Sequence, residues 1–419
     1  MVSLLAQRKY RIILAANFIS LFGSGLNSAG TIWYVLSRTG SEGAVALLVV
    51  LTTVPSLFFL PFTGLLIDRV DRRHLCLVLD VTRALAVGAV ALATYTGRLQ
   101  LWHLYALSTL VGIGMFIYWP NLSALIQEVV EGRDLVGVNA LLMGAAQSGW
   151  MLAGTLVGLL YGRFGIGGIL AVDALTYAAS ATLYYRLRRG KCVSYRKRHE
   201  QETVGTFAHE LAAGLRYALR HRAVLVVGTA SALFHAAMIS QNVVTAPLNE
   251  KILKAGAVGY GLCNAGWSLG AIVSSAASAT FRNQGRATQA LWLALGLSGS
   301  ACLVMPFSGL LAFAVLLYFL MGVGRGLAGV SISTALMQQV PKHVMGRTQN
   351  LFSFASIPLQ MGMTFGAGWL AQHLGLAAAF FLIGSTYLGA SALSYGIREH
   401  AAPLPAAEPQ TVMVGHEEL

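Results

Sequence analysis

The sequence predicts an all-α membrane protein of twelve transmembrane helices, arranged as two six-helix bundles related by pseudo-two-fold symmetry. Three observations predict it: few charged residues, long runs without any charge, and a segment that recurs in the second half. Of the 419 residues, 56% are hydrophobic and only 11% are Asp, Glu, Lys or Arg. A soluble domain carries about 25% charged residues. Because so few charges cannot cover a water-exposed surface, we expect lipid to surround most of the chain.

The charge-free runs give the number of spans. Roughly 20 apolar residues cross the hydrocarbon core of a bilayer. Five runs hold one span each, and the run 348–397 holds two that turn near 373–375. The segment 287–341 holds two more, with a turn at 306–309, and 75–96, 165–185 and 255–281 complete the twelve. The five single spans are 12–37, 43–67, 99–127, 135–162 and 223–249.

The basic residues predict the orientation. With the N-terminus in the cytoplasm, 22 of the 29 Lys and Arg residues lie on the cytoplasmic side, five on the other side and two within spans. Cytoplasmic loops carry the excess of Lys and Arg, so we expect both termini in the cytoplasm. This pattern explains the net charge of +13 without a nucleic-acid partner. The first charge-free run is too long for a signal-peptide core and stays as a helix.

The chain divides after the sixth span. Residues 124–130 (ALIQEVV) match residues 335–341 (ALMQQVP) at an offset of 211, which favours an internal duplication. We therefore expect an N-terminal half at 1–187, a basic cytoplasmic linker at 188–221, a C-terminal half at 222–398 and a disordered cytoplasmic tail at 399–419. The four cysteines show no paired spacing, so neither a disulfide framework nor a metal site is expected. We expect no cofactor.

The loop between the second and third spans carries the most specific motif. It reads Gly64-Leu-Leu-Ile-Asp-Arg-Val-Asp-Arg-Arg73 and resembles the signature loop of the major facilitator superfamily, with Asp71 where that family usually has Gly. Short segments on helices 3, 4, 7 and 11 resemble the branch that holds the enterobactin exporter and the macrolide-efflux proteins. The resemblance covers the whole chain. It implies the two-half fold of that superfamily and transport of a small molecule by alternating access.

The resemblance also implies a role for this loop. A carboxylate and three arginines in a short turn can join two helices by charge-assisted hydrogen bonds. In the family, the residues that Asp68 and Arg72 resemble form a latch at the cytoplasmic gate. The alternative is that the arginines only set the topology. The predicted gate residues are Gly64, Asp68, Arg69, Arg72 and Arg73.

Two positions depart from the pattern of proton-coupled exporters of this family. Thr155 stands where helix 5 usually has a proline, and Ser24 stands where helix 1 of this branch often has an acid. The family resemblance therefore implies proton coupling less directly than it implies the fold.

Two acids fall inside predicted spans, where an ionised side chain costs roughly 2.5–3.5 kcal/mol. Asp80 precedes Arg83 by three residues, so the two are expected to form an ion pair on one helix face. Asp173 has Tyr177 one turn along the helix as a candidate hydrogen-bond partner. Both acids are candidates for proton coupling, and a structural role is the alternative for each.

Arg325 is the one other charge within a span, in the glycine-rich segment Met321-Gly-Val-Gly-Arg-Gly-Leu327. A guanidinium stays charged, so it needs a water-filled cavity, an acid, or main-chain carbonyls as an anchor. His235 is mid-span and is either functional or a packing residue. Trp33 is either in the cavity or an interfacial anchor. The predicted substrate-binding residues are Arg325, His235, Trp33, Tyr118, Gln241 and Asn242.

These features predict a secondary exporter in a bacterial cytoplasmic membrane that moves a small organic anion, such as a siderophore, out of the cell. The leading alternative is a multidrug or macrolide efflux transporter. Uptake by the same fold, and a non-transporting sensor or scaffold, are further alternatives. The sequence contains no nucleotide-binding loop, catalytic triad or metal-ligand spacing, so an enzyme is not expected. The expected partners are the substrate, protons and the bilayer, with the chain as a monomer.

Overall fold

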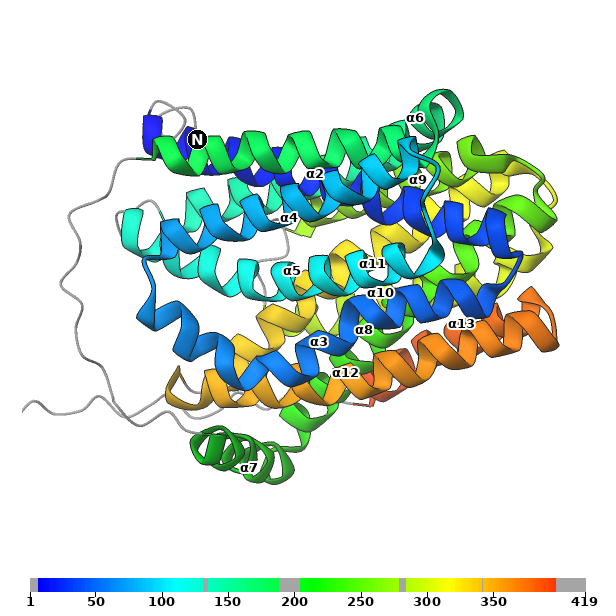
Figure 1. The fold of residues 1–419 in the computed structure, drawn as a ribbon. Helices are drawn as coiled ribbons and strands as arrows, with labels where there is room; N and C mark the ends of the chain where they lie inside the picture. Colours follow the sequence, from blue (N-terminus) through cyan, green and yellow to red (C-terminus); the bar gives the residue numbers. More distant parts are fainter. Residues whose placement is uncertain (1–6, 131–134, 188–203, 279–283, 341, 397–419) are drawn as a thin grey trace, which may run out of the picture.

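The computed structural model describes residues 7–130, 135–187, 204–278, 284–340 and 342–396. Long helices run side by side along one direction (Figure 1). Successive spans alternate in direction, so the start of the first and the end of the last lie at the same end of the bundle. We call this the terminal end and the opposite one the distal end. The predicted tail, 399–419, lies outside the described residues.

The first half contains five continuous helices that make six spans. The longest one breaks at Gly165, whose φ of 62° and ψ of −166° are not helical. Glycine lacks a Cβ and adopts positive φ without strain, so the chain reverses there and one helix becomes two spans. The helices are α2 (Arg8–Thr39), α3 (Glu42–Arg69), α4 (Arg72–Tyr95), α5 (Leu101–Val129) and α6 (Leu135–Arg186).

The second half contributes six spans, one per helix. At the distal end, the first of them continues into a π-helical turn (Leu248–Ile252) and the third into a 3-10 turn (Met305–Phe307). The helices are α8 (Arg222–Pro247), α9 (Gly256–Ser278), α10 (Gln284–Val304), α11 (Leu311–Gln339), α12 (Lys342–His373) and α13 (Leu376–Tyr395).

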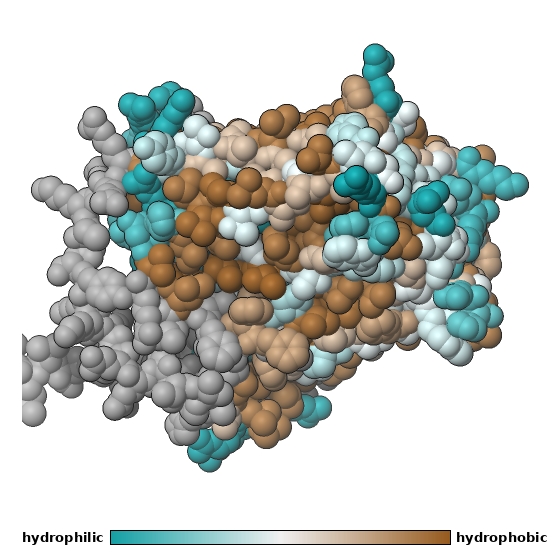
Figure 2. Space-filling view, viewed as in Figure 1, coloured by the Kyte–Doolittle hydropathy of each residue, from teal (hydrophilic) through white to brown (hydrophobic). Residues whose placement is uncertain are grey.

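The predicted fold class is confirmed. Eight of the described helices, with the two-span α6 counted once, are each long and apolar enough to cross a membrane. No strand occurs in the described ranges. Hydrophobic side chains cover the middle of the bundle in Figure 2, and most hydrophilic ones lie toward its ends. The surface therefore has the apolar belt that a bilayer requires.

One helix lies inside the segment that the sequence predicted as a linker. This helix, α7 (Val204–Arg220), packs on α12 and leads directly into α8. Its apolar and polar residues segregate to different faces, which explains why a segment with three charged residues is helical. The remainder of the predicted linker that precedes it, 188–203, lies outside the described residues.

Each half has its own packed interior. In the first half α6 packs against α2 and α4, and in the second α11 packs against α9 and α10. The halves meet along two seams, one between α6 and α9 and one between α3 and α12.

Candidate transport site and gates

A buried polar cluster fills the interior of the first half, between α2, α4, α5 and the second part of α6. Arg83 on α4 is 1% exposed and Asp80, one turn earlier, is 0% exposed. Arg83 Nη2 and Asp80 Oδ1 lie 3.6 Å apart, so the expected ion pair is present. Ser180 on α6 donates a hydrogen bond of 2.6 Å to Oδ2 of Asp80. The pair therefore ties α4 to α6.

Aromatic rings enclose the guanidinium of Arg83. Its Cζ lies 5.2 Å from the ring centroid of Tyr118 and 5.0 Å from that of Tyr177. Its Nη2 lies 3.5 Å from the carbonyl oxygen of Gly114. Ring faces attract cations, and more strongly when the cation is desolvated. These contacts hold the charge of Arg83 beside Asp80.

Asp173 on α6 is a second buried carboxylate of this cluster. Asn27 on α2 donates a hydrogen bond of 2.7 Å to its Oδ2, and Thr176 Oγ1 lies 3.5 Å from its Oδ1. The sequence pointed to Tyr177 as the partner, but the Tyr177 hydroxyl instead lies 2.8 Å from Oγ of Ser24. The tyrosine hydroxyl therefore contacts α2. No ion pair of Asp173 occurs in the described part of the chain.

The cluster therefore holds two carboxylates and one guanidinium. Asp80 lies beside the guanidinium, so Asp173 carries either a proton or a negative charge without a counter-ion. An unpaired buried charge is costly. Within this cluster, Asp173 is the acid that can gain or lose a proton without breaking an ion pair.

Tyr118, predicted to bind substrate, belongs to this cluster as well. Its side chain is fully buried. Its hydroxyl donates to Asn17 Oδ1 at 3.3 Å and lies 2.9 Å from the hydroxyl of Tyr184. In this conformation Tyr118 packs over Arg83 in the interior of the first half. It does not line an opening.

Arg325 on α11 occupies an apolar and aromatic environment in the second half. Its Cζ lies 4.3 Å from the ring centroid of Trp267 on α9, and its Nε lies 3.2 Å from the sulfur of Met238 on α8. Its Nη1 is buried without a hydrogen-bond partner. Across the described residues, no acid lies within 4 Å of it and no main-chain carbonyl accepts its hydrogen bonds. Arg325 is therefore a cation with an unused donor.

Contacts between α8 and α11 run from the distal end to Arg325. Tyr318 donates a hydrogen bond of 2.8 Å to Thr245, and one turn further Gln241 Nε2 lies 3.7 Å from the sulfur of Met321. The Met238–Arg325 contact is the next along this line. One turn closer to the terminal end, exposed residues occur on both helices, namely His235 on α8 and Gly329 and Val330 on α11. On the terminal side of Arg325 both helices therefore carry exposed residues, whereas their facing side chains on the distal side are buried. We call this exposed region the opening beside Arg325.

His235 lies at this opening. Its Nδ1 is 2.7 Å from the carbonyl oxygen of Ser231. Its neighbours along α8, Phe234 and Ala236, are buried. Of the other predicted substrate-binding residues, Gln241 is buried at the α8–α11 contact and Asn242 is half-buried, donating to a main-chain carbonyl of its own helix at 3.1 Å.

The distal ends of the two halves are joined by polar and aromatic contacts. Glu42, in the first turn of α3, forms an ion pair of 2.5 Å with Lys251 after α8. Ser41 donates a hydrogen bond of 3.3 Å to Gln372 of α12. The ring of Trp33, predicted to line the cavity, lies 5.9 Å from that of Tyr260 on α9. These contacts, which we call the distal seal, close the molecule at that end. Glu42 directly precedes the predicted span 43–67, and no local spacing indicates its role, because its partner is 209 residues away.

Small residues let the halves approach closely beside the distal seal. A Cβ on Gly154 would lie 2.9 Å from that of Asn264, and a Cβ on Gly158 would lie 2.7 Å from Cα of Val258. Thr155, which replaces the expected proline, is exposed and donates to the carbonyl of Met151 at 2.9 Å. The close contact of α6 with α9 therefore depends on the two glycines and not on a proline.

The signature loop holds α4 to other helices of the first half. Arg72 Nη1 lies 3.7 Å from Glu128 on α5, and Arg73 donates to the carbonyls of Tyr184 and Tyr185 on α6 at 2.7 and 2.5 Å. In this conformation the two described arginines join α4 to α5 and α6. The predicted gate residues whose side chains lie outside the described part are Gly64, Asp68 and Arg69.

Asp71 caps α4. Its carboxylate accepts hydrogen bonds of 3.0 Å from the main-chain N–H groups of Arg73 and His74. This cap explains how the chain tolerates Asp where the family usually has Gly, since both are accepted at the N-cap of a helix.

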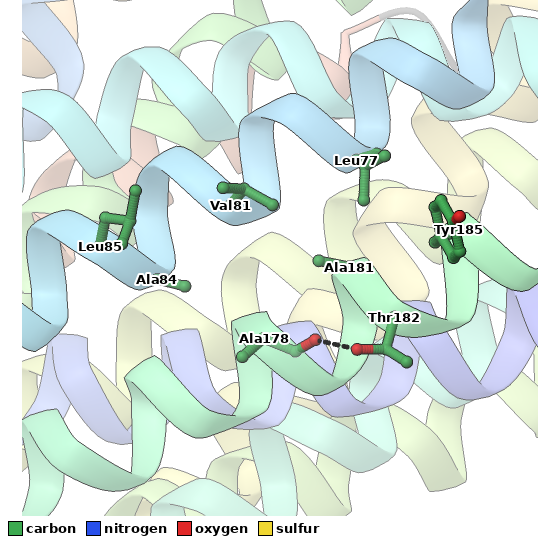
Figure 3. A pocket seen from close by; sticks show the side chains of 8 residues that line it. All are labelled: Leu77, Val81, Ala84, Leu85, Ala178, Ala181, Thr182 and Tyr185. Carbon is green, nitrogen blue, oxygen red and sulfur yellow. Dashed lines mark hydrogen bonds between the residues drawn. The ribbon is translucent and has the colours of Figure 1, made fainter.

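A groove of about 380 Å³ lies between α4 and α6 on the flank of the first half (Figure 3). Its lining is almost wholly apolar, and Leu85 and Tyr185 are largely exposed. The groove opens to the side of the bundle, where lipid lies, so it is separate from the opening beside Arg325. The lining residues are Leu77, Val81, Ala84, Leu85, Ala178, Ala181, Thr182 and Tyr185.

Comparisons with known proteins agree with this architecture. Residues 13–356 match the Major Facilitator Superfamily. Macrolide efflux protein A of Streptococcus pyogenes is 22% identical over 386 residues, which cover 90% of this chain and 93% of that protein. The uncharacterised MFS-type transporter YfiS of Bacillus subtilis is 24% identical over 396 residues, 90% of each chain.

Solved structures share the fold. The nucleoside transporter NupG superposes with a TM-score of 0.69 at 11% identity, covering 93% of this chain and 99% of that chain. A POT family transporter in complex with a thioalcohol-conjugated peptide gives 0.72 at 12% identity, covering 94% and 96%.

Twelve spans in two packed halves, with charged side chains inside each half, define a multi-pass membrane transporter rather than an enzyme. The chain belongs to the major facilitator superfamily.

Proposed function

We propose that this protein exports a small organic molecule from the cytoplasm by alternating access. The observation that carries this proposal is the asymmetry between the ends: the distal seal joins the two halves, while residues of α8 and α11 are exposed on the terminal side of Arg325. A site near the middle, reached from one end only, is what alternating access requires. The export direction is supported by the macrolide efflux relatives.

The proposal includes an orientation. The excess of basic residues at the terminal end favours a cytoplasmic location of both termini, in the cytoplasmic membrane of a bacterium. The opening beside Arg325 then faces the cytoplasm, and the molecule has the conformation in which it accepts an exported substrate. In this scheme the predicted gate residues around Asp68 act when the terminal end closes. We expect the chain to work as a monomer.

The proposed substrate is an anion, such as a carboxylate-bearing siderophore. Arg325 supports this class because its Nη1 is buried without a partner, and because no described acid neutralises it. Planar guanidinium groups bind carboxylates through paired hydrogen bonds. His235, exposed at the same opening, is placed to contact the same ligand.

The proposed coupling ion is the proton, carried by Asp173. The support is the unequal number of buried acids and bases in the first half, which leaves this carboxylate without a counter-charge. Asp80 is assigned a structural role, because protonating it would leave Arg83 unpaired.

A secretion assay tests the substrate class. We expect deletion of the gene, or Arg325→Ala, to lower the siderophore found in the medium under iron limitation, with Arg325→Lys retaining part of the activity. Unchanged secretion together with raised sensitivity to macrolides would show that the substrate is a drug and not an organic anion. That second candidate is equally supported by the named relatives, and the aromatic residues near Arg325 suit it.

Reconstitution tests whether the protein transports at all. Purified protein in liposomes is expected to move substrate when a proton gradient is imposed. Substrate movement that follows the gradient in the uptake direction would reverse the proposed direction. No movement of either substrate class would favour a sensor or scaffold.

A further inference from the structure

Helix α7 presents a second functional surface, outside the transport path. We propose that α7 lies in the headgroup layer of the membrane at the terminal end and binds anionic phospholipid. In this arrangement two leucines enter the apolar region and two arginines contact phosphate.

The position of α7 along the bundle follows from its contacts. A Cβ on Gly214 would lie 2.7 Å from the carbonyl oxygen of Arg347, near the start of α12. The hydroxyl of Tyr217 donates a hydrogen bond of 3.3 Å to the carbonyl oxygen of Gln339, the last residue of α11. Both contacts lie where spans end. Helix α7 is strongly foreshortened in Figure 1, so its axis crosses that of the spans beside it. It therefore lies at the level of the membrane boundary and across the bundle direction.

One face of α7 is fixed to the second half. Ala218 is fully buried, Gly214 is buried, and the ring of Tyr217 stacks on His221 with centroids 4.1 Å apart. Because Gly214 has no side chain, the main chain of α7 lies close to that of α12. The helix is therefore part of the second half and not a loose linker.

The outward part of α7 carries leucines beside arginines. Leu215 is 44% exposed and Leu219 is 62% exposed, and one turn separates them on the same side of the helix. Arg216 and Arg220, each one residue further along, form a parallel exposed row. An apolar row flanked by a basic row is the pattern of helices that lie in a membrane surface.

The chemistry of this face favours lipid as the occupant. At the membrane boundary, leucines on the bilayer side contact acyl chains while neighbouring guanidinium groups reach phosphates. The attraction of anionic headgroups is worth about 1 kcal/mol for each basic residue near the surface. Arg222, exposed at the start of α8, adds a third cation at the same level.

Lipid binding here would act on one half only. Helix α7 is held by α12 and continues into α8, both in the second half. A headgroup contact would therefore anchor that half in the leaflet while the first half moves against it.

Fluorescence quenching in nanodiscs tests the proposal. Single cysteines are introduced as Leu219→Cys or, as the matched control one position on, Arg220→Cys, in a Cys192→Ser background whose other cysteines are buried. Each is labelled with an environment-sensitive fluorophore. In bilayers containing phosphatidylglycerol we expect lipid-borne doxyl groups to quench position 219 severalfold more than position 220, and aqueous iodide to show the opposite order.

A second experiment varies the charge of the lipid and of the helix. Replacing phosphatidylglycerol by phosphatidylcholine, or introducing Arg216→Gln with Arg220→Gln into the Leu219→Cys protein, is expected to lower doxyl quenching at 219. Equal accessibility of both positions to iodide would overturn the membrane location of α7. Quenching at 219 that is indifferent to lipid charge and to both Arg→Gln changes would overturn the anionic-lipid site.

Discussion

Glu42 of the first half and Lys251 of the second form an ion pair of 2.5 Å across the distal seal. The carboxylate side chain is 3% exposed and the lysine side chain 48% exposed, so the pair is only partly shielded from solvent. Its main effect is expected on the balance between conformations, because the two residues belong to halves that must separate when the distal end opens.

Glu42→Gln is expected to favour the conformation that is open at the distal end. The measurement is the distance between spin labels at exposed distal positions of the two halves. The charge-exchanged variant Glu42→Lys with Lys251→Glu is the matched control and should restore the original distribution. If Glu42→Gln leaves the distance distribution unchanged, the pair does not stabilise the seal.

Asp173→Asn should abolish the coupling of transport to protons without affecting folding. The amide keeps a similar shape and still accepts a hydrogen bond from Asn27, so we expect a folded protein that exchanges substrate across liposomes without a gradient. Accumulation driven by an imposed proton gradient should be lost. Gradient-driven transport equal to wild type would exclude Asp173 as the proton carrier.

Asp80→Asn should instead destabilise the fold. It leaves the buried guanidinium of Arg83 without its counter-ion, and breaking a buried pair in this way costs about 3–5 kcal/mol. We expect a markedly lower midpoint of thermal unfolding in detergent. A variant as stable as wild type would contradict the structural role assigned to Asp80.

Trp267 is expected to support Arg325 through its ring face. Trp267→Leu removes a cation–π contact worth roughly 0.5–2 kcal/mol, whereas Trp267→Phe keeps part of it. Substrate affinity, measured by binding to purified protein, should fall in the order wild type, Phe, Leu. The same order for an uncharged macrolide would indicate that Trp267 contacts substrate directly and does not act through the arginine.

Asp71→Ala should lower stability by about 1 kcal/mol, because two main-chain N–H groups at the start of α4 lose their acceptor. Asp71→Gly should cost only a few tenths of a kcal/mol, in keeping with the glycine usual at this position in the family. The measurement is the thermal unfolding of the two variants. Equal losses of stability would show that helix capping does not explain why this chain carries Asp71.

The sequence was sufficient for the fold because spans and loop charges follow from composition alone. The Asp80–Arg83 pair was also predictable, since three residues on a helix fix the geometry. By contrast, the burial of Tyr118 depends on how α5 is rotated about its axis, and the apolar pattern of a membrane helix does not determine this. The distal seal joins residues from opposite halves, so no local spacing indicates it.

The repeat relates the two membrane arginines in a way that the sequence alone did not indicate. At the offset of 211, Gly114 corresponds to Arg325. In the first half the space at Gly114 is occupied by the guanidinium of Arg83 from α4. Each half thus places a guanidinium near the corresponding point of the repeat, from a different helix. Among the described residues, only the first half supplies an acid beside it.

The proton that Asp173 is proposed to carry determines how transport would respond to membrane voltage. In the proposed scheme one proton enters for each substrate that leaves, so export of a monovalent anion moves two charges per cycle, an uncharged substrate one, and a monovalent cation none. Each charge is worth about 2.3 kcal/mol per 100 mV, so anion export would gain about 4.6 kcal/mol from that potential. The electric current that accompanies each exported molecule would therefore report the charge of the natural substrate.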